Sequence, residues 1–434
     1  KSGPTIDPVV LEPFARRFDD IILQTFLKVL EIENISEDQK LQIQLALKEG
    51  GCGVRSHDLK ELQRLYVSSA LLVAPAVLAA TGEHIGAGSL DDAEGGTFEF
   101  QLASSIRDMV AHGCSRPDFN EGGRLSANVW ANSVSSKFQK ILKARIDHLH
   151  NMLPLEDCKR SRARIKSCSG VGAQWVAALP TSPKTMFTDA EFRINTRFRL
   201  GSETNSLEVC PHISAEGVEC DAVCDRWGYH LQQCPSGGGY FVGHDTVCAE
   251  VADLAGGDER IPGVVVDWKA QVDAWPRTTR GYEADVGLYH IPGERDIYLD
   301  AVLSLANPRT YPGCENKAGK VAELWARRKN AEHPVFDRQT GRRLQPFDFC
   351  ALAFERHGFI AKETKSFIQK LARIKAAHYE LDPSEEIRKW YTVISCCIQR
   401  ANAKILCGDP TPSRRRAPPR SLLAGPHDLA LCGS

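Results

Sequence analysis

Two aspartates lie at symmetric positions around a Pro-Gly turn in the segment 283–305. Asp285 and Asp300 are equally far from the midpoint of Pro292 and Gly293, so an antiparallel hairpin would place them opposite each other on one face. Facing carboxylates repel, and a buried carboxylate is costly unless it is neutralised, hydrogen-bonded or bound to a cation. Oxygen ligands favour Mg²⁺ or Mn²⁺, and such a metal can activate water against a phosphodiester. The pair therefore predicts a divalent-metal site, and the alternative is two solvated aspartates at strand ends.

A cluster of cysteines with one histidine precedes this hairpin, in the sequence C-D-A-V-C-D-R-W-G-Y-H-L-Q-Q-C. Soft thiolates and an imidazole at this spacing fit a structural tetrahedral Zn²⁺ site, because four protein ligands leave no open position for catalysis. The candidate ligands are Cys220, Cys224, His230 and Cys234, with Cys210, His212 and His244 as nearby substitutes. The alternative is a small core in which the thiols only pack together.

Arginines alternate with aromatic residues in the segment 191–200, E-F-R-I-N-T-R-F-R-L. This pattern suits contact with a nucleic-acid backbone as well as a half-buried helix. The candidate phosphate contacts are Arg193, Arg197 and Arg199. A basic run at 159–166 is typical of a solvated helix face.

The elements that must position these residues follow from hydrophobic periodicity. Helices are predicted at 13–32, 41–47, 67–80, 125–153, 247–254, 319–330 and 347–373. Strands are predicted at 263–270, 284–289 and 297–305. Three glycines in the segment 50–53 predict a tight turn. A sheet with flanking helices is the natural architecture for the mixed part of the chain.

Length and composition limit the possible classes of protein. A chain of 434 residues is expected to hold two or three domains, and 42% hydrophobic with 25% charged residues is ordinary for a soluble protein. Fifteen cysteines without an N-terminal signal peptide indicate a reducing compartment, although the chain begins at Lys1 rather than at a methionine. The net charge of −1 gives no global attraction to nucleic acid, so such binding must come from local basic patches.

Several phrases together resemble the region that follows the polymerase domain in non-LTR retrotransposon reverse transcriptases. G-G-C-G-V-R-S at 50–56 resembles the phrase after their polymerase region, and 172–201 resembles their linker. C-D-R-W-G-Y-H-L-Q-Q-C resembles their zinc knuckle, and G-H-D at 243–245 stands where they carry Arg-His-Asn. Asp285 and Asp300 match the two acids of their restriction-like endonuclease of the PD-(D/E)xK class. These phrases occur in the family's order between about residues 13 and 375.

The resemblance implies an α+β protein with an N-terminal helical region, a small zinc knuckle and an α/β restriction-endonuclease-like domain. The implied divisions are a thumb-like helical region at 1–155, a basic linker at 156–209, the knuckle at 210–238, the endonuclease domain at 239–380, and a C-terminal helix with a disordered tail at 381–434. The implied activity is nicking of target DNA to prime reverse transcription in the nucleus, with structural Zn²⁺ and catalytic Mg²⁺ or Mn²⁺. The implied partners are the target DNA and the element RNA, with no membrane.

The chain also departs from the family pattern. The first acid follows Y-E-A instead of a proline-containing phrase, and the signature lysine would fall at Val302. Relatives supply that lysine from the next helix, followed four residues later by tyrosine. Lys329 with His333 fits this spacing, with Lys320 and Arg328 as competitors. The polymerase active site is expected to be absent, and the rival functions are a catalytically decayed nucleic-acid-binding fragment and a helical interaction scaffold with a zinc-stabilised insert.

Overall fold

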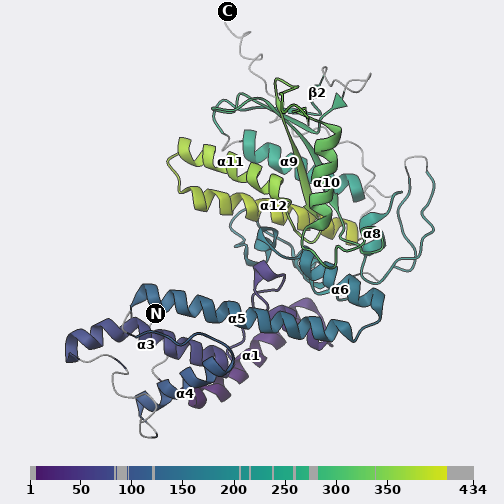
Figure 1. The fold of residues 1–434 in the computed structure, drawn as a ribbon. Coiled ribbons are helices and arrows are strands. Elements are labelled where there is room, and N and C mark those ends of the chain that lie inside the picture. The colour runs from purple at the N-terminus through teal and green to yellow at the C-terminus, as the bar shows by residue number, and fades with distance from the viewer. Residues whose placement is uncertain are drawn as a thin grey trace, which may run out of the picture. The chain divides into compact units, whose positions relative to one another are not determined.

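The computed structural model divides into two compact units. Unit 1 comprises Lys1–Ala46 and Cys52–Leu149, and unit 2 comprises Leu47–Gly51 and His150–Ser434. The protein combines helices with a small mixed sheet, as the predicted α+β class requires (Figure 1). The structure describes residues 6–82, 85, 95, 97–119, 123–204, 207–214, 217–236, 239–257, 261–272, 282–337 and 339–407.

Unit 1 is helical, as its periodicity predicts. Its helices are α1 (Pro8–Leu30), α2 (Glu37–Gln44), α3 (Leu59–Thr81), α4 (Phe98–Ala111) and α5 (Arg124–Asn151). Tyr66, Val67 and Leu71 repeat at helical spacing on α3 and pack with buried residues of α4 and α5. α3 is also the described helix whose length and apolar composition would allow it to cross a membrane, and 33% of its apolar window is buried inside the protein.

The glycine-rich segment forms the predicted turn. Gly50 has a φ of +99°, and a Cβ there would lie 2.4 Å from the Ile165 carbonyl oxygen, so this position requires glycine. The 3₁₀ helix η1 (Leu47–Glu49) leads into the turn. Beyond it, the Val54 N–H donates to the Ile43 carbonyl at 3.1 Å.

Unit 2 is built around a four-stranded sheet with the strand order β1-β4-β5-β6. The strands are β1 (Val265–Trp268), β4 (Val286–Tyr289), β5 (Ile297–Ser304) and β6 (Asp348–Glu355), and a separate pair is β2 (Gln271–Val272) with β3 (Tyr282–Glu283). β4 pairs antiparallel with β1 and β5, whereas β6 runs parallel to β5. The predicted strands at 263–270, 284–289 and 297–305 are thus confirmed.

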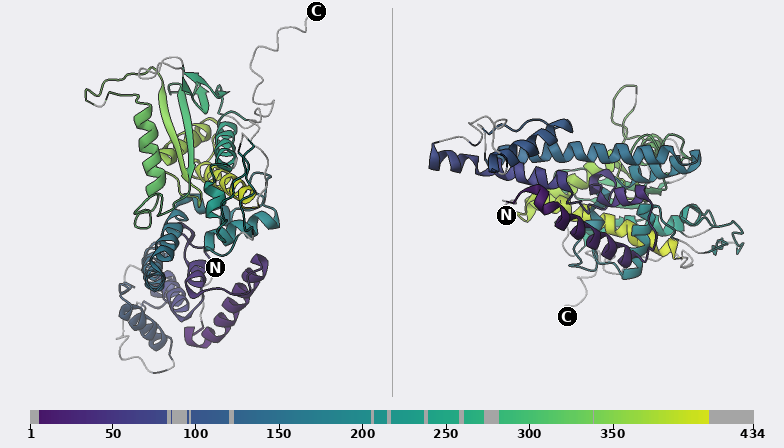
Figure 2. Two further views of the ribbon diagram at one scale, coloured as in Figure 1. Left: turned by 90° about the vertical axis from the view of Figure 1, so that its right-hand side faces the viewer. Right: turned by 90° about the horizontal axis from the view of Figure 1, so that it is seen from below.

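Helices cover both faces of this sheet (Figures 1 and 2). Leu299, Ala301 and Leu303 of β5 face a core built with α9 (Gly239–Gly256), α11 (Lys362–His378) and α12 (Pro383–Leu406). Val302 faces the opposite core, which includes residues of α10 (Lys320–Glu332). This alternation is the period of two that a strand buried on both faces must show.

The helix predicted at 347–373 is wrong in its first part. The segment D-F-C-A-L-A-F-E forms β6, and the helix α11 begins only at Lys362. Nearly every residue of β6 is buried, because cores lie on both faces. Such a strand is a continuous apolar run whose periodicity does not distinguish it from a buried helix.

The predicted linker at 156–209 is packed structure within unit 2. It forms α6 (Leu155–Ser167), the 3₁₀ helix η2 (Val171–Ala177) and α7 (Asp189–Leu200). Gly172 lies so close to Gly358 that an added Cβ would overlap the Gly358 carbonyl oxygen. α12 packs against α7, α9, α11 and η2, so the C-terminal helix belongs to the core of this unit. The predicted tail from Asp409 onward lies outside the described residues.

Candidate active site and metal centre

The two aspartates lie where β4 separates from β5. The last paired residues of the two strands are Val286 and Leu299. If pairing continued in the same register, Asp285 would lie opposite Asp300. Pairing stops there because the chain before Asp285 turns toward β2, where the Ala284 N–H donates to the Ala270 carbonyl. The Ala301 N–H then donates to Asp285 Oδ2 at 2.8 Å. A carboxylate therefore replaces the backbone partner that the separating strand no longer supplies.

Asp285 is buried and has two further polar partners. Lys269 Nζ lies 2.7 Å from Oδ1, and His244 Nε2 lies 2.8 Å from Oδ2. Burial acts to raise the pKa of Asp285, but the bonds from His244, Lys269 and Ala301 outweigh it and hold that pKa well below its usual range. Burial likewise acts to lower the pKa of His244, whereas its bonds to Asp245 and Asp285 raise it to about 9. At neutral pH this carboxylate therefore faces two cations.

Asp300 has its own cation, supplied from the other side of the sheet. Lys329 Nζ donates to Asp300 Oδ2 at 2.7 Å, and His333 Nε2 lies 3.7 Å from the same oxygen. Burial acts to lower the pKa of Lys329, but Asp300 reverses this and raises it. Burial and the charge of Lys329 lower the pKa of His333 to about 4, so this imidazole is neutral at neutral pH.

Among the basic residues of α10 considered for this role, Lys329 is the one that reaches the acids. Lys320 donates to the Pro312 carbonyl at 2.5 Å, and Arg328 pairs with Glu332 on an exposed helix face. The spacing that singled out Lys329 and His333 therefore corresponds to a shared contact with Asp300. Lys329 lies in the last turn of α10, and His333 is the residue that ends the helix, with its N–H donating to the Lys329 carbonyl at 2.9 Å.

Sequence reasoning did not assign Lys269 or His244 to this site. Lys269 follows β1 in a left-handed conformation with φ of +58°, and neither lysine spacing nor periodicity points to it. His244 was considered as a substitute zinc ligand and as part of the G-H-D phrase at 243–245, without a role beside the aspartates. Glu250, six positions further along α9, points elsewhere: it pairs with Lys184 at 3.1 Å and is not among the partners of the aspartates.

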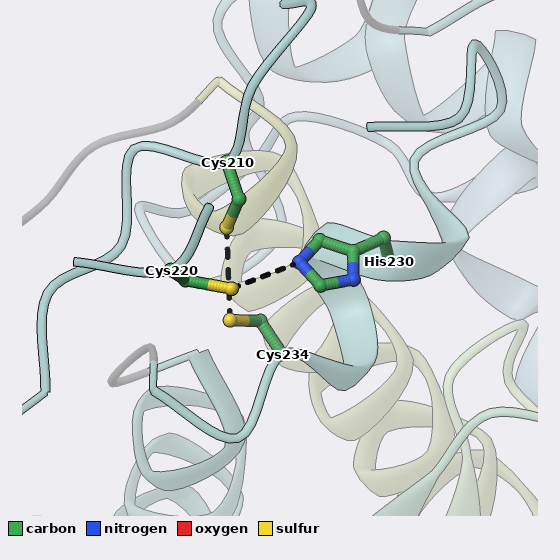
Figure 3. Close-up of side chains that lie close together, drawn as sticks. All are labelled: Cys210, Cys220, His230 and Cys234. Atoms are coloured by element: carbon green, nitrogen blue, oxygen red, sulfur yellow. Dashed lines mark hydrogen bonds between the residues drawn. The ribbon is translucent and has the colours of Figure 1, made fainter. Parts of the chain in front are cut away.

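The cysteine-histidine cluster forms a compact set of potential metal ligands (Figure 3). The ligand atoms of Cys210, Cys220, His230 and Cys234 all lie within 4.8 Å of one another. Three sulfurs and one imidazole nitrogen are compatible with zinc. Cys220 and Cys210 come from two facing segments, and His230 and Cys234 come from the short helix α8 (Tyr229–Gln233) and its end.

One predicted ligand needs correction, because Cys210 takes the place expected for Cys224. The segments around 209–213 and 219–223 pair as a hairpin, and the Cys210 N–H donates to the Ala222 carbonyl at 3.0 Å. This pairing brings Cys210 beside Cys220, a proximity that linear spacing does not show. Cys224 is partly buried and packs beside the cluster.

The thiols of the cluster differ in acidity. A backbone hydrogen bond at Ala222 lowers the pKa of Cys220. Burial raises the pKa of Cys210 to about 12. A metal ion would favour the thiolate of both, because only the thiolate is a strong ligand.

The arginines of α7 do not form a common surface. Arg199 is buried with 2% exposure, and its guanidinium donates to the Gly51 carbonyl at 2.7 and 3.1 Å. The structure therefore does not expose it for the predicted phosphate contact, and its guanidinium instead holds the glycine turn through the Gly51 carbonyl. Arg193 and Arg197 are half-buried. Arg164, from the basic run predicted to be solvated, is also buried and donates to the Arg199 carbonyl.

No model of a known protein family matches the chain, and no curated protein matches it either. Two carboxylates, two lysines and two imidazoles meet where the sheet opens. Such a set can hold a divalent cation and stabilise negative charge on a bound phosphate.

The revised zinc ligands can be tested with a matched pair of substitutions. Cys210→Ser should release the bound zinc, because it removes one of four converging donors, whereas Cys224→Ser should retain one ion per chain. The measurement is the zinc content of protein purified without chelator. Equal loss of zinc in both variants would restore Cys224 to the ligand set.

The structural role of Arg199 predicts a loss of stability. Arg199→Ala should lower the free energy of unfolding by about 2–4 kcal/mol, because it leaves buried carbonyls without a donor and opens a cavity. Arg388→Ala, which removes an exposed ion pair with Glu385, should cost under about 1 kcal/mol. Urea unfolding measures both, and equal midpoints for the two variants would show that Arg199 is not a structural residue.

Proposed function

We propose that the chain is the post-polymerase part of a non-LTR retrotransposon reverse transcriptase and that unit 2 is its metal-dependent DNA endonuclease. The observation that carries the proposal is the joint contact of Lys329 and His333 with Asp300, beside Asp285 at the point of strand separation. The resemblance requires a lysine from the helix after the second acid. α10 packs on β5 and β6, and the contact of its Lys329 with Asp300 supports the proposal.

The donors at the proposed site fit a hard divalent cation. Asp285 and Asp300 offer carboxylate oxygens, which Mg²⁺ and Mn²⁺ prefer. Both carboxylates are only 5–7% exposed, so they have lost most of their hydration. In the structure Lys269 and Lys329 balance their charge. A divalent ion bound there would lower the pKa of a water ligand and offset charge on the phosphodiester.

The side chains around the two aspartates would have separate roles in catalysis. Lys329 remains protonated at neutral pH and would donate to a non-bridging phosphate oxygen or orient the attacking water. His333 is neutral and would keep Lys329 beside Asp300 without adding positive charge. The Ala301 N–H and His244 fix the carboxylate of Asp285, so its orientation is set before substrate binds.

The proposed partners are target DNA and element RNA. Arg193 and Arg197 would contact phosphates without distinguishing bases, and the cluster around Cys210 would hold the neighbouring loops with structural zinc. Nuclear localisation follows from the same proposal, since nicking requires access to chromosomal DNA.

One observation favours a second function, a catalytically decayed fragment that only binds nucleic acid. Each carboxylate already has a lysine at 2.7 Å, so the site is balanced electrostatically without a metal. The first acid also lacks the family's proline, since the chain has Y-E-A before Asp285. A decayed copy would keep the fold and the ion pairs while losing metal affinity.

The nuclease proposal predicts a specific pattern of nicking on supercoiled DNA in Mg²⁺. Lys329→Ala should reduce the nicking rate by about 100-fold or more, because it removes a donor to developing charge. Asp300→Asn should abolish metal-dependent nicking. The matched controls are Arg328→Ala, on the adjacent exposed position, and Asp348→Asn, whose carboxylate pairs with Arg343 at 2.7 Å. Both controls should stay within about twofold of the wild type, because each removes a partly or largely exposed ion pair that does not involve Asp285 or Asp300.

Two outcomes would decide against catalysis by this site. The first is nicking by Lys329→Ala at the rate of Arg328→Ala. The second is no nicking by the wild type together with an equal effect of millimolar Mg²⁺ on the melting temperatures of wild type and Asp300→Asn. The second outcome would favour the decayed fragment.

A further inference from the structure

A second group of ligand-type side chains lies on the other side of Asp285. His244 and Cys248 are four residues apart on α9, which places them one above the other on one helix face. The ligand atoms of His244, Cys248 and Asp285 lie within 4.8 Å of one another. Asp285 and Cys248 are buried, and the His244 side chain is 12% exposed.

The orientation of His244 is fixed by a second carboxylate. Its Nδ1 lies 2.9 Å from Asp245 Oδ1, while its Nε2 faces Asp285 Oδ2 at 2.8 Å. A histidine that binds a metal through one ring nitrogen commonly donates from the other to a carboxylate. Asp245 is therefore placed to hold the Nδ1 proton, and loss of the Nε2 proton would turn that nitrogen into a ligand.

A buried cysteine is usually an ordinary core residue, but the surroundings of Cys248 differ from those of such a residue. Cys350 lies in the same hydrophobic core and is also buried. Among the described residues, Cys248 belongs to a group of side chains that could together hold a metal ion, whereas Cys350 does not. The distinguishing feature of Cys248 is thus the convergence of an imidazole and a carboxylate on its sulfur.

We propose that His244, Cys248 and Asp285 form a second metal site, selective for a borderline transition ion such as Zn²⁺ and open at one coordination position. Nitrogen and sulfur donors disfavour Mg²⁺, which prefers oxygen alone, and suit Zn²⁺ or Co²⁺. Three protein ligands leave the fourth position for water or a phosphate oxygen, unlike the cluster around Cys210, where four ligands close the site.

This site stands independently of the nuclease but would extend it. Asp285 directs Oδ2 toward His244 and Oδ1 toward Lys269, so the two oxygens face different neighbours. An ion on the Oδ2 side would replace the positive charge of the protonated imidazole. The oxygen on the Lys269 side would stay available to the Mg²⁺ proposed between Asp285 and Asp300.

The test uses Co²⁺ as the probe on the full chain after removal of metal with a chelator. Wild type should bind two thiolate-ligated ions per chain, one in each cysteine-containing site, counted by their charge-transfer absorption; only these ions are counted in the comparisons that follow. Cys248→Ser should bind one ion, and the matched core variant Cys350→Ser should bind two. Cys210→Ser should also bind one, and its remaining absorption should disappear when Cys248→Ser is added.

Equal Co²⁺ stoichiometry in Cys248→Ser and Cys350→Ser would overturn the second site. If Cys248→Ser fails to fold by circular dichroism, His244→Gln takes its place in the comparison, because its side chain is partly exposed. Nicking in Mg²⁺ is measured separately on the same wild-type protein. One bound Co²⁺ with intact nicking rejects the second site alone, whereas two bound Co²⁺ without nicking rejects the nuclease alone.

Discussion

The bond from the Ala301 N–H to the carboxylate of Asp285 is the interaction on which the site depends. When β4 leaves β5, a buried amide of β5 needs a new acceptor, and leaving it without one would cost about 1–3 kcal/mol. Asp285 supplies that acceptor, but a buried carboxylate then requires cations of its own. Lys269 and His244 satisfy this requirement. A single carboxylate thereby joins a strand, the segment after β1 and helix α9.

Asp300 repeats this arrangement with groups from another element. Its cation, Lys329, comes from α10, which packs on the face of the sheet opposite the core that contains α9. The opening between β4 and β5 is therefore flanked by positive charge from both faces. A phosphate entering there would meet cations whose positions are already fixed by ion pairs, which lowers the reorganisation that binding requires.

The parts of this arrangement that the sequence predicted are those with a local cause. The symmetric hairpin placed Asp285 and Asp300 in register because a short turn fixes strand pairing. Lys329 was chosen because the family resemblance implies a lysine on the next helix, and its contact with Asp300 depends on how that helix packs on the sheet. β6 was missed because burial on both faces removes the alternation that identifies a strand. Cys210 was ranked below Cys224 because its proximity to Cys220 comes from hairpin pairing across intervening residues.

The buried arginines show why a role in phosphate binding is hard to predict from sequence. A guanidinium presents several donors in a plane, which suits a phosphate and equally suits a group of backbone carbonyls. Arg199 donates to the Gly51 carbonyl at the glycine turn, and Arg164 donates to the Arg199 carbonyl in the last turn of α7, so each meets a backbone carbonyl instead of a phosphate. Sequence shows the guanidinium but not its acceptor. Burial separates the two roles, so the proposed phosphate contacts require basic side chains that remain partly exposed, as Lys269 and Lys329 do at 29% and 23%.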